Sequence, residues 1–491
     1  MGAINSGLMA ALIVGYVALQ LGVGLWVSRR VKTDTDYFVA GRRLGLVPVA
    51  LSVFATWFGA ETILSSSAEI ASGGLAGGRA EPFGYAICLV AMALFIAGAF
   101  RAKGYVTLAD FFRDRFGRIA ELACVWLTIP VSIIWAAAQL IALSVLMHTA
   151  LGVPEGATLL AAALLVMTYT AFGGLLGDVA TDIIQSIVLV VGLIVALGAL
   201  IAHLGGVDGL FTSIEPAQLT LVGEGETWLG RLDIWAVPIL GSLVTQEAIS
   251  RFLSARDAQV AQRACFTAAG LYLAVGAAPV LLGLAGVHIV GAEEGDNFLL
   301  ALMRETASPI VFILFTGALL SAILSTADSN ILSVSSLVSV NLVAKFHARA
   351  SERMKLILAR AGTIAASLIA YAIAAGGASI RDLITLTSVL GQAGLLVAVL
   401  FGLRSQLGSE RAALAGIAAA VVANLWSLAL WPMQQMLRDG ETVPAAFGLL
   451  LAGEAPALDG SFLLSVLAAL IGYVAIGLWE QRRAAPTAQG G

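Results

Sequence analysis

Long apolar runs are the feature that most restricts how this chain can fold. Charged residues are nearly absent over about 20 positions at a time, the length of helix that crosses the ~30 Å hydrocarbon core of a bilayer. Membrane β-strands are excluded, because they need only ~10 residues in an alternating pattern that these runs lack. The chain is therefore predicted to be an all-α polytopic membrane protein. Thirteen spans are expected, at residues 7–28, 46–70, 82–100, 119–149, 157–175, 177–202, 232–252, 265–290, 306–343, 356–376, 381–403, 410–432 and 461–481.

Composition narrows the class of protein further. Only 12% of the 491 residues are charged and 59% are hydrophobic, which leaves too little polar surface to cover soluble domains. The odd set of Cys88, Cys124 and Cys265, each in an apolar stretch, excludes a secreted disulfide scaffold. A net charge of −4 argues against nucleic acid as a partner. The expected partners are the lipid bilayer and a small-molecule solute, and the chain is expected to be a monomer or a weak homo-oligomer.

No segment has the features of an enzyme. The longest loops, about 203–231 and 433–460, are too short for a soluble catalytic domain, and no GxxxxGK[ST] motif is present to bind ATP. The histidines show no metal-ligand spacing. The chain is therefore expected to form one membrane domain over residues 1–491, without an organic cofactor.

The positions of lysine and arginine predict the orientation. With the N-terminus outside, 22 of the 27 basic residues fall in inner loops, as the positive-inside rule requires. The first run lacks a basic n-region and precedes Arg29 and Arg30, which indicates a membrane span rather than a cleaved signal peptide. Arg251 is assigned to an inner loop, and no lysine or arginine is expected in the interior of the second to tenth spans. The C-terminus is then cytoplasmic, and the expected location is the plasma membrane, or the inner membrane of a bacterium.

Two spans have the composition of a broken helix. The second contains Gly59, Glu61, Thr62 and several serines, which suit freed carbonyls that face a cavity better than a helix that faces lipid. The seventh contains Pro238 and Thr245. Packing between helices is the alternative role for serine and threonine, but it does not explain Glu61. Because the two spans lie five helices apart, they mark corresponding positions in two halves of a transporter.

The ninth span carries a face of small and hydroxyl side chains. Sodium is a hard cation that prefers oxygen ligands, so the adjacent hydroxyls of Ser325 and Thr326 are candidate ligands. A plain packing face is the alternative. In the sixth span, Asp178 is interpreted as a helix cap, whereas Asp182 lies deeper and is a functional candidate. The face of the ninth span comprises Ala322, Ser325, Thr326, Ser329, Ser333 and Ser336.

The polar interior is acidic and partly aromatic. Glu61 and Glu81 favour cations, since an obligate anion site would need arginine or lysine. Trp57, Tyr85 and Trp135 offer ring faces to a quaternary ammonium group. Packing or an interfacial position is the alternative for each of these aromatic residues.

The same clusters contain motifs of a known family. The chain resembles the sodium:solute symporter family along nearly its whole length. The resemblance is carried by the stretches Asp36–Arg42, Tyr169–Gly174, Thr181–Gln185, Arg251–Ala255 and Leu324–Ser329. It implies a LeuT-like core of two inverted five-helix repeats. These repeats would cover residues 46–202 and 232–403, with an extra N-terminal helix at 7–28 and two C-terminal helices at 410–481.

The resemblance also implies sodium sites on particular residues. A first sodium position would use the backbone carbonyls of Ala55, Phe58 and Ala322 and the hydroxyls of Ser325 and Thr326. A second, inward-side sodium position is linked to an aspartate that Asp182 matches. Sodium is thus the expected coupling ion.

Within the family, the chain looks most like the high-affinity choline transporters. Trp57, Tyr85 and Trp135 match an aromatic cage for a trimethylammonium group, but Thr245 stands where that cage has a tryptophan. Glu61 and Glu81 stand where that branch has small residues. These departures favour a smaller or hydrogen-bonding cation, or a zwitterion. The expected substrate-binding residues are Trp57, Glu61, Thr62, Glu81, Tyr85, Trp135 and Thr245.

The resulting hypothesis is a sodium-coupled secondary symporter. It would import a small organic solute such as an amine, a quaternary ammonium compound or a zwitterion. Two alternatives stay open: a proton-coupled transporter of the same fold that uses Glu61 or Glu81, and a membrane sensor built on a transporter-like domain.

Overall fold

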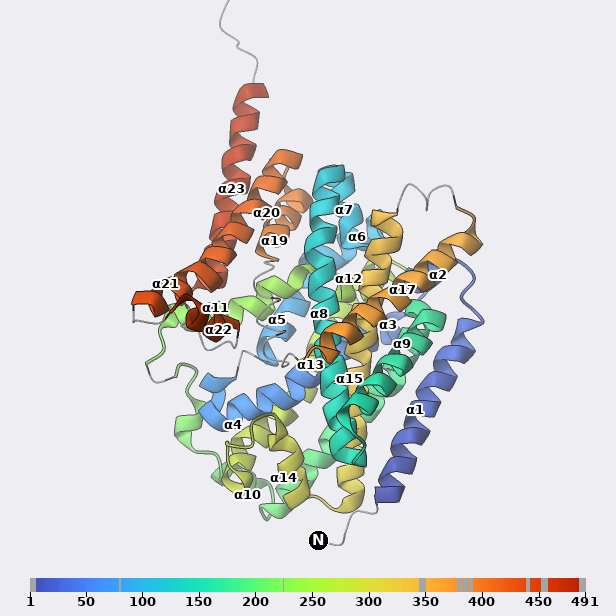
Figure 1. The fold of residues 1–491 in the computed structure, drawn as a ribbon, viewed down its shortest axis with the longest axis vertical. Helices are drawn as coiled ribbons and strands as arrows, with labels where there is room; N and C mark the ends of the chain where they lie inside the picture. The colour runs from blue at the N-terminus through green and yellow to red at the C-terminus, as the bar shows by residue number, and fades with distance from the viewer. Residues whose placement is uncertain are drawn as a thin grey trace, which may run out of the picture.

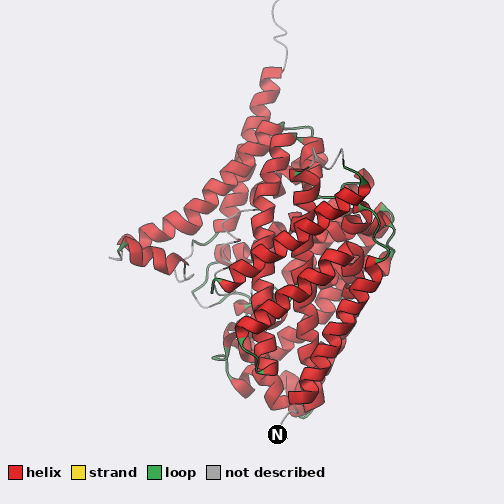
Figure 2. Cartoon of the chain, turned by 45° about the vertical axis from the view of Figure 1, so that its right-hand side comes forward, coloured by secondary structure: helices red, strands yellow, loops and turns green. Residues whose placement is uncertain are grey.

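The computed structural model shows an all-helical chain (Figure 2). Among the residues that it describes there is no strand, only an isolated bridge between Leu44 and Ala255. The described residues are 6–78, 81–223, 225–343, 350–377, 383, 387, 392–438, 442–451 and 458–484.

Within these residues, nine helices are long and apolar enough to cross a membrane, and two bent pairs raise the number of candidate spans to eleven. The straight candidates are built from α1 (Ser6–Ser28), α5 (Phe83–Met92) with η3 (Ala93–Ala97) and α6 (Gly98–Lys103), α8 (Arg118–Leu151), α9 (Glu155–His203), α13 (Ala258–Val290), α15 (Pro309–Ser336) with η7 (Leu337–Leu342), α17 (Glu352–Ala375), α20 (Glu410–Leu425) with η8 (Trp426–Leu430) and α21 (Trp431–Arg438), and α23 (Ser461–Ala484).

The two bent pairs are the second and seventh spans predicted from the sequence. The first joins α3 (Leu46–Trp57) to η2 (Glu61–Ser65) and α4 (Ser66–Gly77) with a bend of 63°. The second joins α11 (Trp228–Leu240) and η5 (Gly241–Val244) to α12 (Gln246–Leu253) with a bend of 49°. The prediction of two broken helices is therefore confirmed.

Two local features explain why eleven candidate spans stand where the sequence predicts thirteen. The predicted spans 157–175 and 177–202 both lie in α9, whose 49 residues comprise two helices that meet at a kink at Gly174, where φ is 52° and ψ is −157°. A side chain at Gly174 would lie 2.6 Å from the Tyr37 ring, so glycine is required there. The predicted span 381–403 is represented by α19 (Ala393–Arg404), and most of its first half lies outside the described residues.

Short helices lie between several of the spans. Three of them begin with a capping box, in which Thr33 pairs with Asp36, Thr107 with Asp110 and Glu215 with Gln218. The short helices are α2 (Asp34–Val39), η1 (Ala40–Arg42), α7 (Leu108–Arg115), α10 (Val207–Thr212), η4 (Pro216–Leu219), η6 (Gly295–Asn297), α14 (Phe298–Thr306) and α22 (Val443–Leu451).

Helix α15 lies at the centre of the bundle and packs against α8, α9 and α17 (Figure 1). Nearly every residue of its second half is buried, including its serines and threonines. The same helix contacts α3 and α12, one half of each broken span. The hydroxyl face of α15 thus lies in the protein interior, beside the helix breaks, and not against lipid.

Candidate functional site

The break in the second span frees backbone carbonyls that a regular helix would keep in its own hydrogen bonds. Helix α3 ends at Trp57, and Phe58 follows with non-helical angles, φ −76° and ψ 67°. The π-helix η2 begins only at Glu61. In the seventh span, Thr245 is the non-helical residue, with φ −80° and ψ 131°. Carbonyls freed by such breaks are available to a bound ion.

The residues expected at the first sodium position come together at this break. The Ser325 hydroxyl donates to the carbonyl oxygens of both Ala55 and Ala322, each at 2.9 Å. The Thr326 hydroxyl donates to the Ala322 carbonyl at 3.1 Å. Phe58 lies in the same break and is fully buried. The carbonyls of Ala55 and Ala322 and the hydroxyls of Ser325 and Thr326 are thus neighbours, and neutral oxygens of this kind suit a hard monovalent cation.

Gly59 brings the break into contact with α15. A Cβ atom at this position would lie only 2.7 Å from the Thr326 hydroxyl oxygen. Glycine therefore permits the segment after Phe58 to pack directly against the hydroxyl face. This contact links the two elements that supply the oxygen set.

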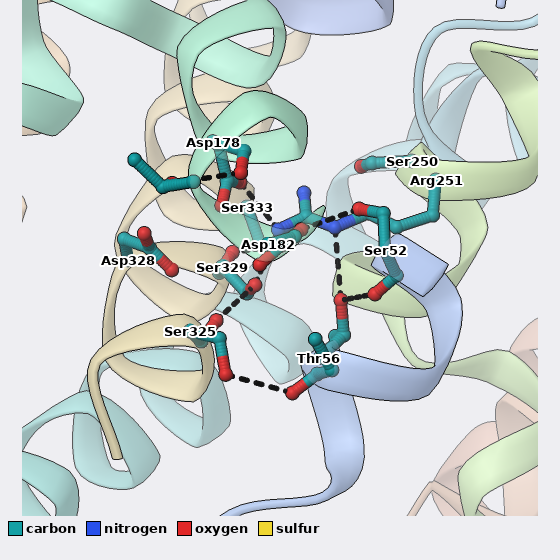
Figure 3. Close-up of polar contacts among 12 residues, drawn as sticks. Ser52, Thr56, Asp178, Asp182, Ser250, Arg251, Ser325, Asp328, Ser329 and Ser333 are labelled. Atoms are coloured by element: carbon teal, nitrogen blue, oxygen red, sulfur yellow. Dashed lines mark hydrogen bonds and ion pairs between the residues drawn. The ribbon is translucent and has the colours of Figure 1, made fainter. Parts of the chain in front are cut away.

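Asp182 lies on α9 near this oxygen set (Figure 3). Its side chain is fully buried, and Oδ2 accepts a hydrogen bond of 2.5 Å from the Ser52 hydroxyl of α3. The other oxygen, Oδ1, has no hydrogen-bond partner in the described part of the chain. A buried carboxylate with an unsatisfied oxygen suits a cation or a water molecule.

Arg251 corrects one expectation from the sequence. The sequence assigns it to an inner loop, but it lies in the last turn of α12 and is fully buried. Its Nη2 group forms an ion pair with Asp178 and donates to the Ser329 hydroxyl, while Nε donates to the Thr56 hydroxyl at 2.9 Å. The capping role expected for Asp178 stays a prediction: Asp178 lies four residues after the kink at Gly174, and its buried carboxylate pairs with Arg251.

A cavity of about 440 Å³ lies beside the breaks. It is lined by five of the seven residues expected to bind substrate, namely Glu61, Glu81, Tyr85, Trp135 and Thr245. This lining combines carboxylates, aromatic rings and a hydroxyl, which together suit a small solute with a cationic group.

The other two expected residues lie beside the cavity rather than among its described lining residues. The Trp57 ring packs on Tyr85 with centroids 5.2 Å apart, and its Nε1 donates to Glu247 at 3.4 Å. The Thr62 hydroxyl lies 2.7 Å from the Tyr272 hydroxyl, which also donates to the Trp57 carbonyl. These contacts hold the break and the Tyr85 ring in place.

The C-terminal helices supply a wall of the cavity that sequence reasoning missed. Asn424, Ser461 and Phe462 line it from α20 and α23. Asp233 of α11 holds the start of α23 in place, because its carboxylate accepts from the backbone N–H groups of Phe462 and Leu463. Asn424 could have been found from the sequence. A lone amide within an apolar span is a functional candidate for the same reason as Glu61, because polar groups inside a membrane span are costly.

Comparison with known proteins identifies the family. The pattern that defines the "Sodium:solute symporter family" matches residues 37–419 of the chain. The chain belongs to this family. The human high affinity choline transporter 1 is 30% identical over 68% of this chain and 61% of that protein. The Drosophila melanogaster choline transporter is 28% identical over 77% of this chain and 64% of its own length. The symporter chain thus spans less than two thirds of these two relatives.

Other relatives share the membrane region more fully. A sodium/glucose cotransporter of Vibrio parahaemolyticus is 27% identical over 86% of this symporter and 85% of that protein. A solved Na+-coupled sialic acid symporter, in a substrate-bound outward-open state, superposes with a TM-score of 0.75 at 18% identity, over 96% and 97% of the two chains. The predicted all-α polytopic fold with a LeuT-like core is confirmed, and the family is one of transporters, as expected, and not of enzymes.

Proposed function

We propose that this symporter couples inward sodium flow to the import of a small organic solute. The observation that supports the proposal most directly is the oxygen set of Ala55, Phe58, Ala322, Ser325 and Thr326, brought together by the break in the second span. Asp182 supplies a second cation position on the inward side. The coupling ion is Na+, because the first position offers neutral oxygens rather than a titratable group.

The sodium gradient is large enough to drive accumulation. One Na+ that moves down a potential of ~100 mV gains ~2.3 kcal/mol. A tenfold concentration gradient adds ~1.4 kcal/mol. Coupled to one solute molecule, this free energy supports accumulation of roughly a few hundred-fold.

The lining of the cavity supports a particular class of solute. Glu61 and Glu81 favour a positively charged group, and Tyr85 and Trp135 present ring faces to it. We therefore assign an amine, a quaternary ammonium compound or a zwitterion. The relatives include transporters named for choline, glucose and proline. Their solutes are thus a quaternary ammonium compound, a sugar and an amino acid.

The placement of basic residues gives the orientation that we adopt. The N-terminus is outside and the C-terminus is cytoplasmic, in the plasma membrane or the inner membrane of a bacterium. In this arrangement the repeats 46–202 and 232–403 have inverted topology, and residues 7–28 and 410–481 add helices on either side. The working unit is a monomer or a weak homo-oligomer.

Reconstitution into proteoliposomes tests the proposal. A thermal-shift screen first identifies the solute among amines, betaines, amino acids and carboxylates, since a ligand stabilises the protein by RT ln(1 + [L]/Kd). Uptake of that solute is expected to rise with an inward sodium gradient and to exceed equilibrium. Uptake that ignores the sodium gradient contradicts the proposal, and uptake driven by a pH step without sodium would assign proton coupling through Glu61 or Glu81 instead.

Adding a ring to the cavity is expected to shift solute preference. Thr245 lines the cavity with Tyr85 and Trp135, so Thr245→Trp would place a third ring face around a trimethylammonium group. Cation–π contacts of about 1–2 kcal/mol predict that choline gains about tenfold over a primary amine in competition for uptake. Thr245→Leu adds bulk without a π-face and is the matched control. Equal selectivity in the two variants would rule out the aromatic mechanism.

A further inference from the structure

Arg251 occupies a point where four helices meet. It extends from α12, the second half of the broken seventh span, and is fully buried. Its guanidinium group bonds Thr56 on α3, Asp178 on α9 and Ser329 on α15 (Figure 3). We call these four residues the Arg251 cluster. A buried arginine with its carboxylate is costly to assemble and costly to break on one side only.

The Arg251 cluster is bonded to both sodium positions. Toward the first position, the Ser329 hydroxyl donates to the Ser325 carbonyl at 2.5 Å. Toward the second position, the Thr56 hydroxyl donates to the Ser52 carbonyl at 2.7 Å, and Ser52 in turn bonds Asp182. A positive charge is thus fixed between the two places where we assign a cation.

Both ends of α12 make further contacts with neighbouring segments. The Gln246 side chain accepts from the Leu108 backbone N–H at 2.7 Å and donates to the Ser336 hydroxyl at 3.4 Å. Beyond the helix, the Ser254 and Ala255 carbonyls accept from the Leu44 backbone and from the Arg101 side chain. In the orientation that we adopt, Arg101 and Leu44 lie on the cytoplasmic side, so these contacts tie the C-terminal end of α12 to cytoplasmic segments.

We propose that the Arg251 cluster is the inner gate of this symporter. The guanidinium group holds α12 against α3, α9 and α15 and keeps the cytoplasmic route closed. Sodium reaches the cytoplasm when Arg251 separates from Asp178 and Ser329 and α12 moves away. Arg251 is therefore a positioning residue that controls access to the sodium positions. This inference rests on the proposed function for its direction of transport.

The gate is tested by labelling a cysteine placed beneath the cluster. Ser333 lies on the same face of α15, one turn beyond Ser329, and is buried, so Ser333→Cys gives a thiol of similar size. The native cysteines Cys88, Cys124 and Cys265 are fully buried and provide the background. The thiol is labelled from the cytoplasmic side, with a charged maleimide, in inside-out vesicles that contain sodium but no solute.

The deciding variant removes both charges together. Asp178→Asn with Arg251→Gln in the Ser333→Cys protein leaves no buried charge from this pair unpaired, which limits misfolding. The inner gate predicts labelling at least about tenfold faster than in the Ser333→Cys parent, because loss of a charge-assisted contact shifts a two-state population by about that factor. Ser329→Ala changes no charge and is expected to accelerate labelling about threefold. This variant tests the gate if the double variant does not fold.

A second ion pair, whose arginine is buried and whose glutamate is half-buried, supplies the control. Arg231 pairs with Glu226 at 2.5 Å at the outer end of α11, the other half of the same broken span. Arg231→Gln with Glu226→Gln should leave the labelling rate at residue 333 unchanged. Unchanged labelling in both the Asp178/Arg251 and the Ser329 variants overturns the gate. Sodium-independent uptake by the unmodified protein would overturn the proposed function instead, while the labelling result would still report on the closure of α12.

Discussion

Removing both hydroxyls of the first sodium position, by Ser325→Ala together with Thr326→Ala, is expected to raise the sodium concentration for half-maximal uptake by about 100-fold or more. Each hydroxyl that bonds a charged partner contributes about 1.5–3 kcal/mol, and the two effects combine at one ion. The three carbonyl oxygens remain, so the ion still binds, but weakly. The measurement is the initial rate of solute uptake in proteoliposomes against external sodium concentration.

A matched control lies on the same helix. The Thr316 hydroxyl is buried and donates to the Phe312 carbonyl at 2.9 Å, so Thr316→Ala removes a hydroxyl from α15 at a distance from the break. It should leave the sodium requirement within about twofold of the unmodified protein, because the hydroxyl bonds only its own helix. A double variant at Ser325 and Thr326 with unchanged sodium dependence would exclude these residues as ligands.

Local chemistry was enough to predict the breaks and the hydroxyl face. Gly59 weakens a helix, and a run of serines in an apolar span must face protein rather than lipid. These are properties of single segments. Pro238 lies inside α11, and the break of the seventh span falls later, at Thr245. The structure places the breaks and the hydroxyl face in the spans where the sequence predicts them, and it brings Ser325 to Ala55 although 270 residues separate them.

The charge pair at the inner gate could not be predicted in the same way. Arg251 lies at the end of an apolar run, where a count of basic residues assigns it to a loop. Its partner Asp178 is 73 residues away and lies just after a Gly-Gly pair that favours a helix start. Only the packing of α12 against α3 and α15, and the ion pair that joins Arg251 to α9, show that both charges are buried.

The wall formed by Asn424 and Ser461 was missed for a different reason. Two inverted repeats account for a complete binding site, so the last two helices had no role in the expected architecture. The carboxylate of Asp233 fastens the start of α23 to α11, and the Thr227 hydroxyl donates to Asp459 just before α23, so these contacts hold the C-terminal pair beside the cavity. Such a contact depends on the relative placement of distant spans, which no pattern within one span specifies.

Neutralising the carboxylates of the cavity is expected to have the second large effect. Glu61→Gln and Glu81→Gln keep the volume of the side chain but remove its charge, and both residues line the cavity with Tyr85 and Trp135. A charge-assisted hydrogen bond of about 1.5–3 kcal/mol predicts that half-saturation for a cationic solute rises about 10- to 100-fold in each variant. The sodium requirement should change by less than about threefold, since the hydroxyl and carbonyl ligands are intact.

Glu247→Gln is the control that separates the cavity from the acidic interior in general. Its carboxylate accepts from the Trp57 indole at 3.4 Å and is not among the described lining residues of the cavity. A solute that binds through Glu61 and Glu81 should respond weakly to this change, because a screened charge outside the cavity acts only through the field. Competition between the cationic solute and an uncharged isostere gives the decisive reading. If Glu61→Gln and Glu81→Gln leave their ratio as it is in the unmodified protein, the cation is not recognised by charge, and the aromatic faces of Tyr85 and Trp135 must select it instead.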